Sequence, residues 1–216
     1  MPSLDIIILI VLFGLIFDYT NGFHDAANVV STVIATKVLR PLTAILLAAI
    51  LNTIGATQIS GVAETITTGL VQVDTVSQVA VVCALIGAIF WNLLTWYFGI
   101  PSSSSYALIG GVIGASWMHE GVQTILWSGI VYKILIPMIL SPCAGFVLAF
   151  CILKGIQWCL EKGWFNHHGK IFARLQIFSA GLVALSHGLN DAQKSMGVIT
   201  LGLLAGGFIE TSHIPT

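Results

Sequence analysis

The sequence predicts an all-α protein that crosses a membrane several times. Three observations support this fold class. The 216 residues include only 8 Lys and Arg and 9 Asp and Glu, so charged residues make up 8%, against about 25% in a soluble domain. The mean hydropathy is +0.97. Several apolar runs approach about 20 residues, the length that crosses the hydrocarbon core as a helix. Soluble, disordered, collagen-like and disulfide-stabilised proteins are therefore excluded.

The apolar residues fall into eight stretches, several of which are too short to cross a membrane alone. These stretches are 4–17, 23–36, 42–59, 79–99, 105–118, 134–153, 171–186 and 195–209. Only residues 18–22 separate the first two, and only residues 187–194 separate the last two. We interpret each pair as one crossing that is broken in the middle. Broken helices at membrane depth line cavities.

The basic residues predict which way the chain is threaded. Lys37 and Arg40 form one basic spot, and a larger group lies between residues 154 and 174. Both face the cytoplasm by the positive-inside rule, whereas the connection 61–78, which holds acids and no Lys or Arg, suits the outside. An integral membrane protein with its N-terminus outside is predicted. The net charge of −1 leaves no basic surface for nucleic acid.

One short element occurs twice. Residues 21–28 and 187–194 align without gaps, with Gly, Asp and Ala recurring in place. Because five predicted crossings separate the two copies, the second enters the membrane in the opposite orientation. Such an inverted repeat is typical of secondary transporters. We expect residues 1–153 to form a full repeat, 154–170 a cytoplasmic connection, and 171–216 the truncated start of the second repeat.

The repeated element carries an acid in an apolar context. A carboxylate such as Asp25 or Asp191 costs at least about 2.5 kcal/mol in a membrane helix. A bound cation offsets this cost, because carboxylates, Asn amide oxygens and backbone carbonyls are suitable ligands for sodium. A carboxylate can instead bind a proton. The alternative is that Asp25 only caps a helix.

A run of hydroxyls lies between two other apolar stretches, at residues 99–106. Pro101 ends the preceding helix and a Ser cap opens the next, so hydroxyls and unpaired N–H groups converge at the positive end of a helix dipole. Such a place binds an oxyanion. The alternative is a polar turn whose serines bond to their own backbone.

These residues resemble the inorganic phosphate transporter (PiT) family. The resemblance rests on Gly22, Asp25 and Asn28, on the matching part of the second copy at residues 187–191, and on the Pro-x-Ser-x-Ser element at 101–105. It runs through the whole chain. It implies a secondary transporter, not an enzyme, that carries phosphate with sodium or protons and is built from two inverted repeats with broken helices.

The resemblance also implies a set of site residues. Phosphate is expected at Ser102, Ser103, Ser104, Ser105, Asn190 and Lys194. Cations are expected at Asp25, Asp191, Asn21, Asn28 and Asn52, with sodium as the metal at the two acids if transport is coupled to sodium. His24 and His187 are candidates for proton coupling. Lys194 has an alternative role, which is to pair with Asp191 on one helix face.

Four positions depart from the family pattern. His24 stands where the family usually has Asn, Lys194 where the second copy would have Asn, and Tyr106 where His commonly follows the hydroxyls. Asn52 occupies a place where animal members carry Glu. The first three leave the ligand set and the coupling ion open, whereas Asn52 indicates less dependence on a titratable group at that place.

The expected partners are inorganic phosphate and the lipid bilayer, in the plasma membrane of a prokaryote, with no cofactor besides the coupling ion. A counterpart of Pro101 would fall near position 267 by the repeat offset, beyond the 216 residues. We therefore expect a homodimer, or completion by a missing C-terminal half. The alternatives are a sulfate permease of the same family and an inactive membrane fragment or scaffold.

Overall fold

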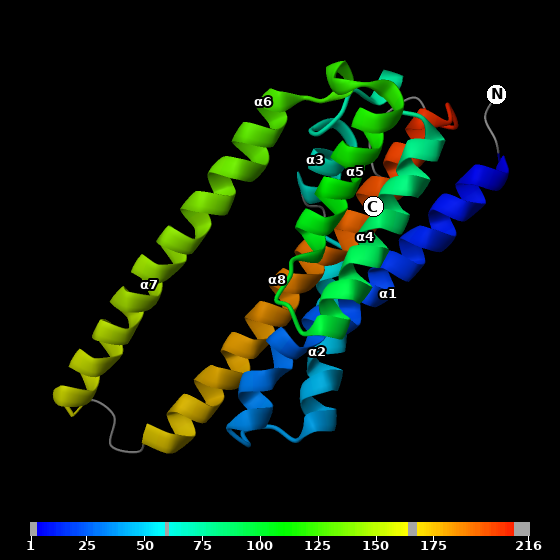
Figure 1. Cartoon of the computed structure of the whole chain (residues 1–216). Helices are drawn as coiled ribbons and strands as arrows, with labels where there is room; N and C mark the ends of the chain where they lie inside the picture. Colours follow the sequence, from blue (N-terminus) through cyan, green and yellow to red (C-terminus); the bar gives the residue numbers. More distant parts are fainter. Residues whose placement is uncertain (1–3, 59–60, 164–167, 210–216) are drawn as a thin grey trace.

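The protein folds as a bundle of helices (Figure 1). The computed structural model describes residues 4–58, 61–163 and 168–209. The helices of eight or more residues are α1 (Leu4–Ala35), α2 (Pro41–Ala56), α3 (Gly61–Thr68), α4 (Gln78–Phe98), α5 (Ser104–Glu120), α7 (Ile136–Glu161) and α8 (His168–Ala205). The shorter elements are η1 (Val73–Thr75), η2 (Val122–Thr124), α6 (Trp127–Ile130) and η3 (Val131–Leu135).

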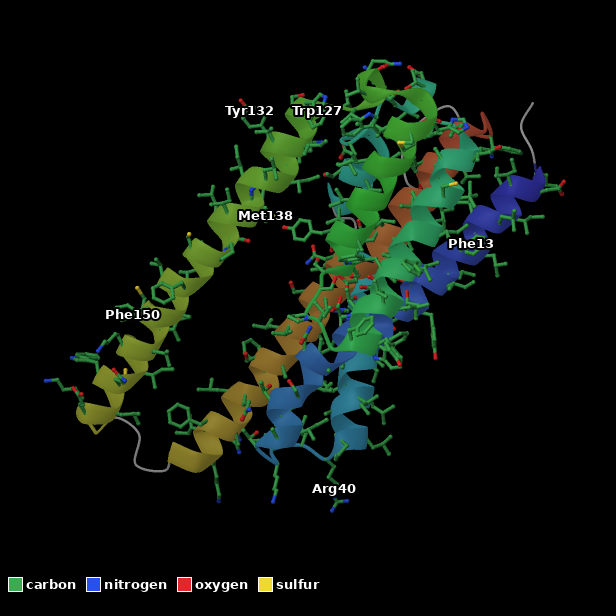
Figure 2. All side chains as sticks on the ribbon, in the orientation of Figure 1. Phe13, Arg40, Trp127, Tyr132, Met138 and Phe150 are labelled. Carbon is green, nitrogen blue, oxygen red and sulfur yellow. The ribbon has the colours of Figure 1, made fainter. Side chains whose placement is uncertain are left out.

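Four helices in the described part of the chain are long and apolar enough to cross a membrane. They are α1, α4, α8 and the continuous stretch Trp127–Glu161. Figure 2 places Arg40 at one end of the molecule and Trp127 and Tyr132 at the other. These findings confirm the predicted all-helical membrane class, whereas the direction of threading stays a prediction.

Helix bounds differ most from the predicted stretches in two places. The predicted crossing 134–153 extends as one 35-residue helical stretch from Trp127 to Glu161, which takes in the first half of the predicted connection. The predicted outer connection 61–78 contains α3 and η1, and Leu70 and Val71 within it are fully buried. Apolar side chains inside that connection explain the difference, because their burial against the bundle stabilises the folded protein.

The prediction of broken helices is wrong for both α1 and α8. Each is one continuous α-helix, of 32 and 38 residues. Residues 18–22 and 187–194 contain no Pro, and a single Gly inside a helix costs only about 1 kcal/mol. Their polar side chains find partners on neighbouring helices, as Asn21 does with Asp191. The backbone therefore has no need to unwind in order to satisfy them.

The two long helices cross antiparallel and in register. Ile10 lies over Gly202, where an added Cβ would come within 2.7 Å of its side chain, and Ile199 lies over Gly14 in the same way. Two polar pairs follow along the contact, since Ser195 donates to Asp18 and Asn21 donates to Asp191. Along α1 the apolar contacts thus come first and the polar pairs follow them.

Helices α4 and α5 place the hydroxyl run against this contact. Helix α4 ends at Gly99, whose φ of 64° lies in the left-handed region that favours glycine. Pro101 follows, and α5 begins at Ser104. The side chains of Ala88, Leu108 and Phe17 lie in one core cluster of α4, α5 and α1. The first turn of α5 therefore lies beside the middle of α1.

Helix α7 stands apart from the other helices in Figure 1. Every residue of α7 from 136 to 155 is exposed, including Met138 and Phe150, which Figure 2 labels. Lipid tails are as apolar as these side chains. An apolar helix with this exposed stretch is therefore compatible with a membrane.

Helices α2 and α8 approach closely at a pair of glycines. A Cβ on Gly188 would meet the carbonyl of Asn52, and one on Gly55 would lie 2.9 Å from the backbone nitrogen of Leu189. We expect Gly188→Ala to cost about 1–3 kcal/mol, because α2 must move away from α8. Thermal unfolding in detergent measures this effect as a lowered Tm.

The matched control for this prediction is Gly87→Ala in α4, because a Cβ there meets nothing within 4 Å. It should leave the Tm unchanged or raise it, since Ala is the better helix former. Equal Tm values for the two variants would contradict the close contact at Gly188.

Candidate functional site

The carboxylate of Asp191 is the centre of a polar cluster between α1, α5 and α8. Its Oδ1 lies 2.7 Å from Nζ of Lys194, one turn further along α8. Its Oδ2 lies 2.8 Å from Nε2 of His187, one turn earlier, and accepts a hydrogen bond of 3.0 Å from Nδ2 of Asn21 on α1. Helical spacings of three and four residues put all three α8 side chains on one face. Two basic groups and one amide thus hold one acid.

Ser104 joins this cluster to the second acid. Its hydroxyl is hydrogen-bonded to Oδ1 of Asn21, lies 3.3 Å from Oδ2 of Asp25, and accepts a bond of 3.2 Å from Nζ of Lys194. Ser104 and Lys194 are each 4% exposed. The first turn of α5 therefore contributes a hydroxyl and free N–H groups to a buried site.

Asp25, His187 and Asp191 together could hold a cation. One ligand atom from each lies within 4.8 Å of the others. With a neutral His187, the two carboxylates and the Lys194 ammonium leave a net charge of −1 inside a membrane protein. One monovalent cation or proton balances that charge, and carboxylate oxygens are suitable ligands for a hard cation.

A cavity of about 230 Å³ reaches this cluster from the side. Apolar residues of α1, α2 and α8 form most of its wall, and the polar residues Asn52 and His187 lie in the same wall. Oδ1 of Asn52 lies 3.4 Å from Nδ1 of His187. His187 therefore stands between the cavity and Asp191.

Seven of the predicted site residues come together here. They are Asn21, Asp25, Asn52, Ser104, His187, Asp191 and Lys194. The pairing of Lys194 with Asp191, which the sequence left open, is present. Their assembly follows from the register of α1 and α8, which brings the two copies of the repeated element side by side.

Other predicted site residues lie outside this cluster. Ser102 accepts a hydrogen bond from Nε1 of Trp91, and Asn190 is exposed and donates to the carbonyl of Ser186, one turn earlier. Asn28 is exposed on α1. None of these three side chains makes a hydrogen bond to the cluster among the described residues, and their predicted roles stay predictions.

Ser103, Ser105 and His24 also make none of the hydrogen bonds that the structure shows within the cluster among the described residues. Ser103 occupies the N-cap position of α5 but makes no side-chain capping bond, unlike the predicted Ser cap. Ser105 follows Ser104 and is half-buried. Nε2 of His24 is buried without a hydrogen-bond partner in the described part of the chain.

One buried acid is absent from the predicted set. Asp18 lies on α1 between apolar turns, and Ser195 donates a hydrogen bond of 2.9 Å to its Oδ1. The insertion cost that drew attention to Asp25 applies equally to Asp18. Because Asp18 has no counterpart in the repeated element, the repeat does not point to it. Nothing in the sequence singles out Ser195.

Long apolar helices around a buried cluster of acids and bases define a helical membrane protein with charged groups in its interior. The profile of the phosphate transporter family matches residues 21–167 and 160–215. The chain belongs to the phosphate transporter family, as the resemblance predicted. The family is one of transporters, which confirms that the chain is not an enzyme.

Two bacterial relatives are similar over nearly the whole chain. A protein of Bacillus subtilis (strain 168) named "Probable low-affinity inorganic phosphate transporter" is 43% identical over 212 residues, covering 97% of this chain and 63% of the relative. A Mycobacterium tuberculosis (strain ATCC 25618 / H37Rv) protein of the same name is 44% identical over 214 residues, covering 97% and 50%. The chain thus spans between half and two-thirds of their length.

One solved structure has a similar fold. It is called "The sodium-dependent phosphate transporter" and matches with a TM-score of 0.80 at 20% identity, over 98% of this chain and 71% of that chain. At this identity the match shows the fold. It confirms the helical membrane architecture.

Proposed function

We propose that the chain carries inorganic phosphate across a membrane together with a cation, by secondary active transport. The observation that carries this proposal is Ser104, which lies against both the ammonium of Lys194 and the carboxylate of Asp25. A hydroxyl, an ammonium and a helix start bind an oxyanion, and the adjoining carboxylates bind a cation. Family membership and the names of the relatives support phosphate as the anion.

The charges make the two ligands depend on each other. Phosphate entering beside Asp25 and Asp191 is repelled while the net charge of the cluster is −1. A cation bound first removes that repulsion, and each ion lowers the cost of removing the other from water. Binding of anion and cation is therefore coupled, which is the requirement for symport.

An inverted repeat provides the alternating access. Along the repeat, Asn21 corresponds to His187 and Asp25 to Asp191. The contact of Asn21 with Asp191 and the approach of His187 to Asp25 are therefore equivalent across an antiparallel crossing. A second polypeptide segment or a second copy of the chain completes the second repeat. The protein lies in the plasma membrane of a prokaryote, with its N-terminus outside.

Sodium and protons are the two candidate coupling ions at Asp25 and Asp191. The structural relative is called sodium-dependent, which favours sodium for that protein, and the oxygen ligands here suit sodium. Uptake measured in vesicles with a sodium gradient, and separately with a pH gradient, distinguishes the two.

The test is uptake of labelled phosphate into vesicles that contain the purified chain, with Ser104→Ala and Ser102→Ala as matched variants. We expect Ser104→Ala to lower phosphate affinity about tenfold or more, since a hydrogen bond to a charged group contributes about 1.5–3 kcal/mol. Ser102→Ala should leave affinity unchanged, because its hydroxyl pairs with Trp91 instead.

Three outcomes would contradict the proposal. Equal losses of phosphate affinity in the two serine variants would show that the anion does not bind at Ser104. Competition by sulfate as strong as by unlabelled phosphate would favour a sulfate permease. Absence of both uptake and cation-dependent phosphate binding in detergent would favour an inactive fragment or scaffold.

A further inference from the structure

Asp18 is an acid near the middle of α1 that the proposed site does not use. It is half-buried, and its neighbour Phe17 is fully buried. Acids at such depth are costly and mark ion pathways or proton relays in membrane proteins. A functional role separate from the proposed site would explain why Asp18 lies at this depth.

The partner of Asp18 differs in kind from the partners of Asp191. Asp191 is held by the ammonium of Lys194, the amide of Asn21 and the ring of His187. An ammonium and an amide NH₂ can only donate, so they bind the carboxylate form of Asp191. These partners therefore suit the carboxylate form of Asp191.

Asp18 has instead a partner that accommodates both of its protonation states. Oγ of Ser195 donates to Oδ1 of Asp18 at 2.9 Å. A hydroxyl is both donor and acceptor, so it can turn and accept a hydrogen bond from the protonated acid. The pair stays hydrogen-bonded whether or not Asp18 carries a proton.

The charged groups that act on Asp18 come from α8. They are Asp191 and Lys194, joined by His187 when its ring is protonated. Helices α2 and α4 contain no Asp, Glu, Lys, Arg or His, and Glu64 of α3 is exposed. His119 and Glu120 lie at the far end of α5. Asp18 thus responds to the charge state of the neighbouring cluster.

We infer that Asp18 is a proton-carrying group, separate from the cation site at Asp25 and Asp191. A water-borne proton binds to the carboxylate on one side of the membrane and returns to water on the other. No bond other than O–H forms or breaks. Arrival of phosphate and a cation at the neighbouring cluster changes the field at Asp18 and so couples proton movement to transport. This inference rests on the proposed function.

The test compares net uptake with exchange in vesicles that contain wild-type protein or Asp18→Asn. Asn resembles the protonated acid but cannot release a proton. We expect the variant to lose proton movement during net phosphate uptake, because its side chain has no acidic proton to release. Exchange of labelled for unlabelled phosphate at equal concentrations should persist, because exchange needs no net proton release. A pH-sensitive dye inside the vesicles reports the protons.

Asp5→Asn is the matched control, since Asp5 is exposed in the first turn of the same helix. It should behave as wild type in both assays. If wild-type protein shows neither uptake nor exchange, the proposed function fails. If wild-type protein shows both and Asp18→Asn moves as many protons per phosphate as wild type, only the present inference is overturned.

A second pair of variants tests the inference should Asp18→Asn fail to fold. Ser195→Thr keeps the hydroxyl and should keep the wild-type pH profile of net uptake. Ser195→Ala removes it and should shift that profile. Identical profiles for the two variants would overturn the inference.

Discussion

Replacing Asp191 with Asn is expected to destabilise the protein more than replacing Asp191 and Lys194 together. Lys194 is almost completely buried, and Asp191 is its only ionic partner among the described residues. Removing one partner of a buried ion pair costs about 3–5 kcal/mol, because the other charge is left uncompensated. Thermal unfolding in detergent should show a large fall in Tm for Asp191→Asn.

The double variant Asp191→Asn with Lys194→Met should recover much of this loss. An apolar side chain of similar length restores packing without a charge. Lys170→Met serves as control, since Lys170 is exposed on the same helix, and it should change stability by less than about 0.5 kcal/mol. A Tm of Asp191→Asn equal to that of the control would show that the pair contributes nothing to folding.

The sequence was sufficient to bring the main site residues together. The repeated element put Asp25 and Asp191 in oppositely threaded segments, and the hydroxyl run put Ser104 at a helix start. Both predictions rest on local chemistry, because an acid in an apolar run needs a partner and a Ser after Pro begins a helix. Antiparallel packing of the two copies then follows.

The sequence could not show whether the helices were broken. Residues 18–22 interrupt an apolar run, and this pattern is the same whether the backbone unwinds or neighbouring helices satisfy the side chains. Here Asn21 and Asp18 find partners on α8. Such tertiary contacts decide between a broken and a continuous helix, and no local pattern reports them.

The sequence also could not predict that the side chains of α7 would be exposed. Met138 and Phe150 of α7 are exposed, whereas Leu85 and Ala88 of α4 are buried, although both helices are mainly apolar. In water, periodic polar residues would mark the exposed face. In a membrane, lipid accepts the same side chains as a protein core does, so the pattern does not separate the two.

Asp25 is the acid that we expect to bind the coupling cation most directly. The oxygens of Asp191 already face Lys194, His187 and Asn21. Asp25 instead accepts a longer hydrogen bond, of 3.3 Å, from Ser104. Asp25 therefore has more lone pairs available for a cation than Asp191, whose oxygens already have three partners.

Asp25→Asn should abolish cation-dependent phosphate uptake while the protein stays inserted in the membrane. Loss of one charge at about 4 Å from a cation costs about 4 kcal/mol at an effective dielectric of 20, roughly a thousandfold in affinity. Titration of uptake against sodium, and against pH, measures this loss. Asp74→Asn is the control, because Asp74 is an exposed acid in η1, and it should titrate as wild type. Unchanged cation dependence in the Asp25→Asn vesicles would place the coupling ion elsewhere.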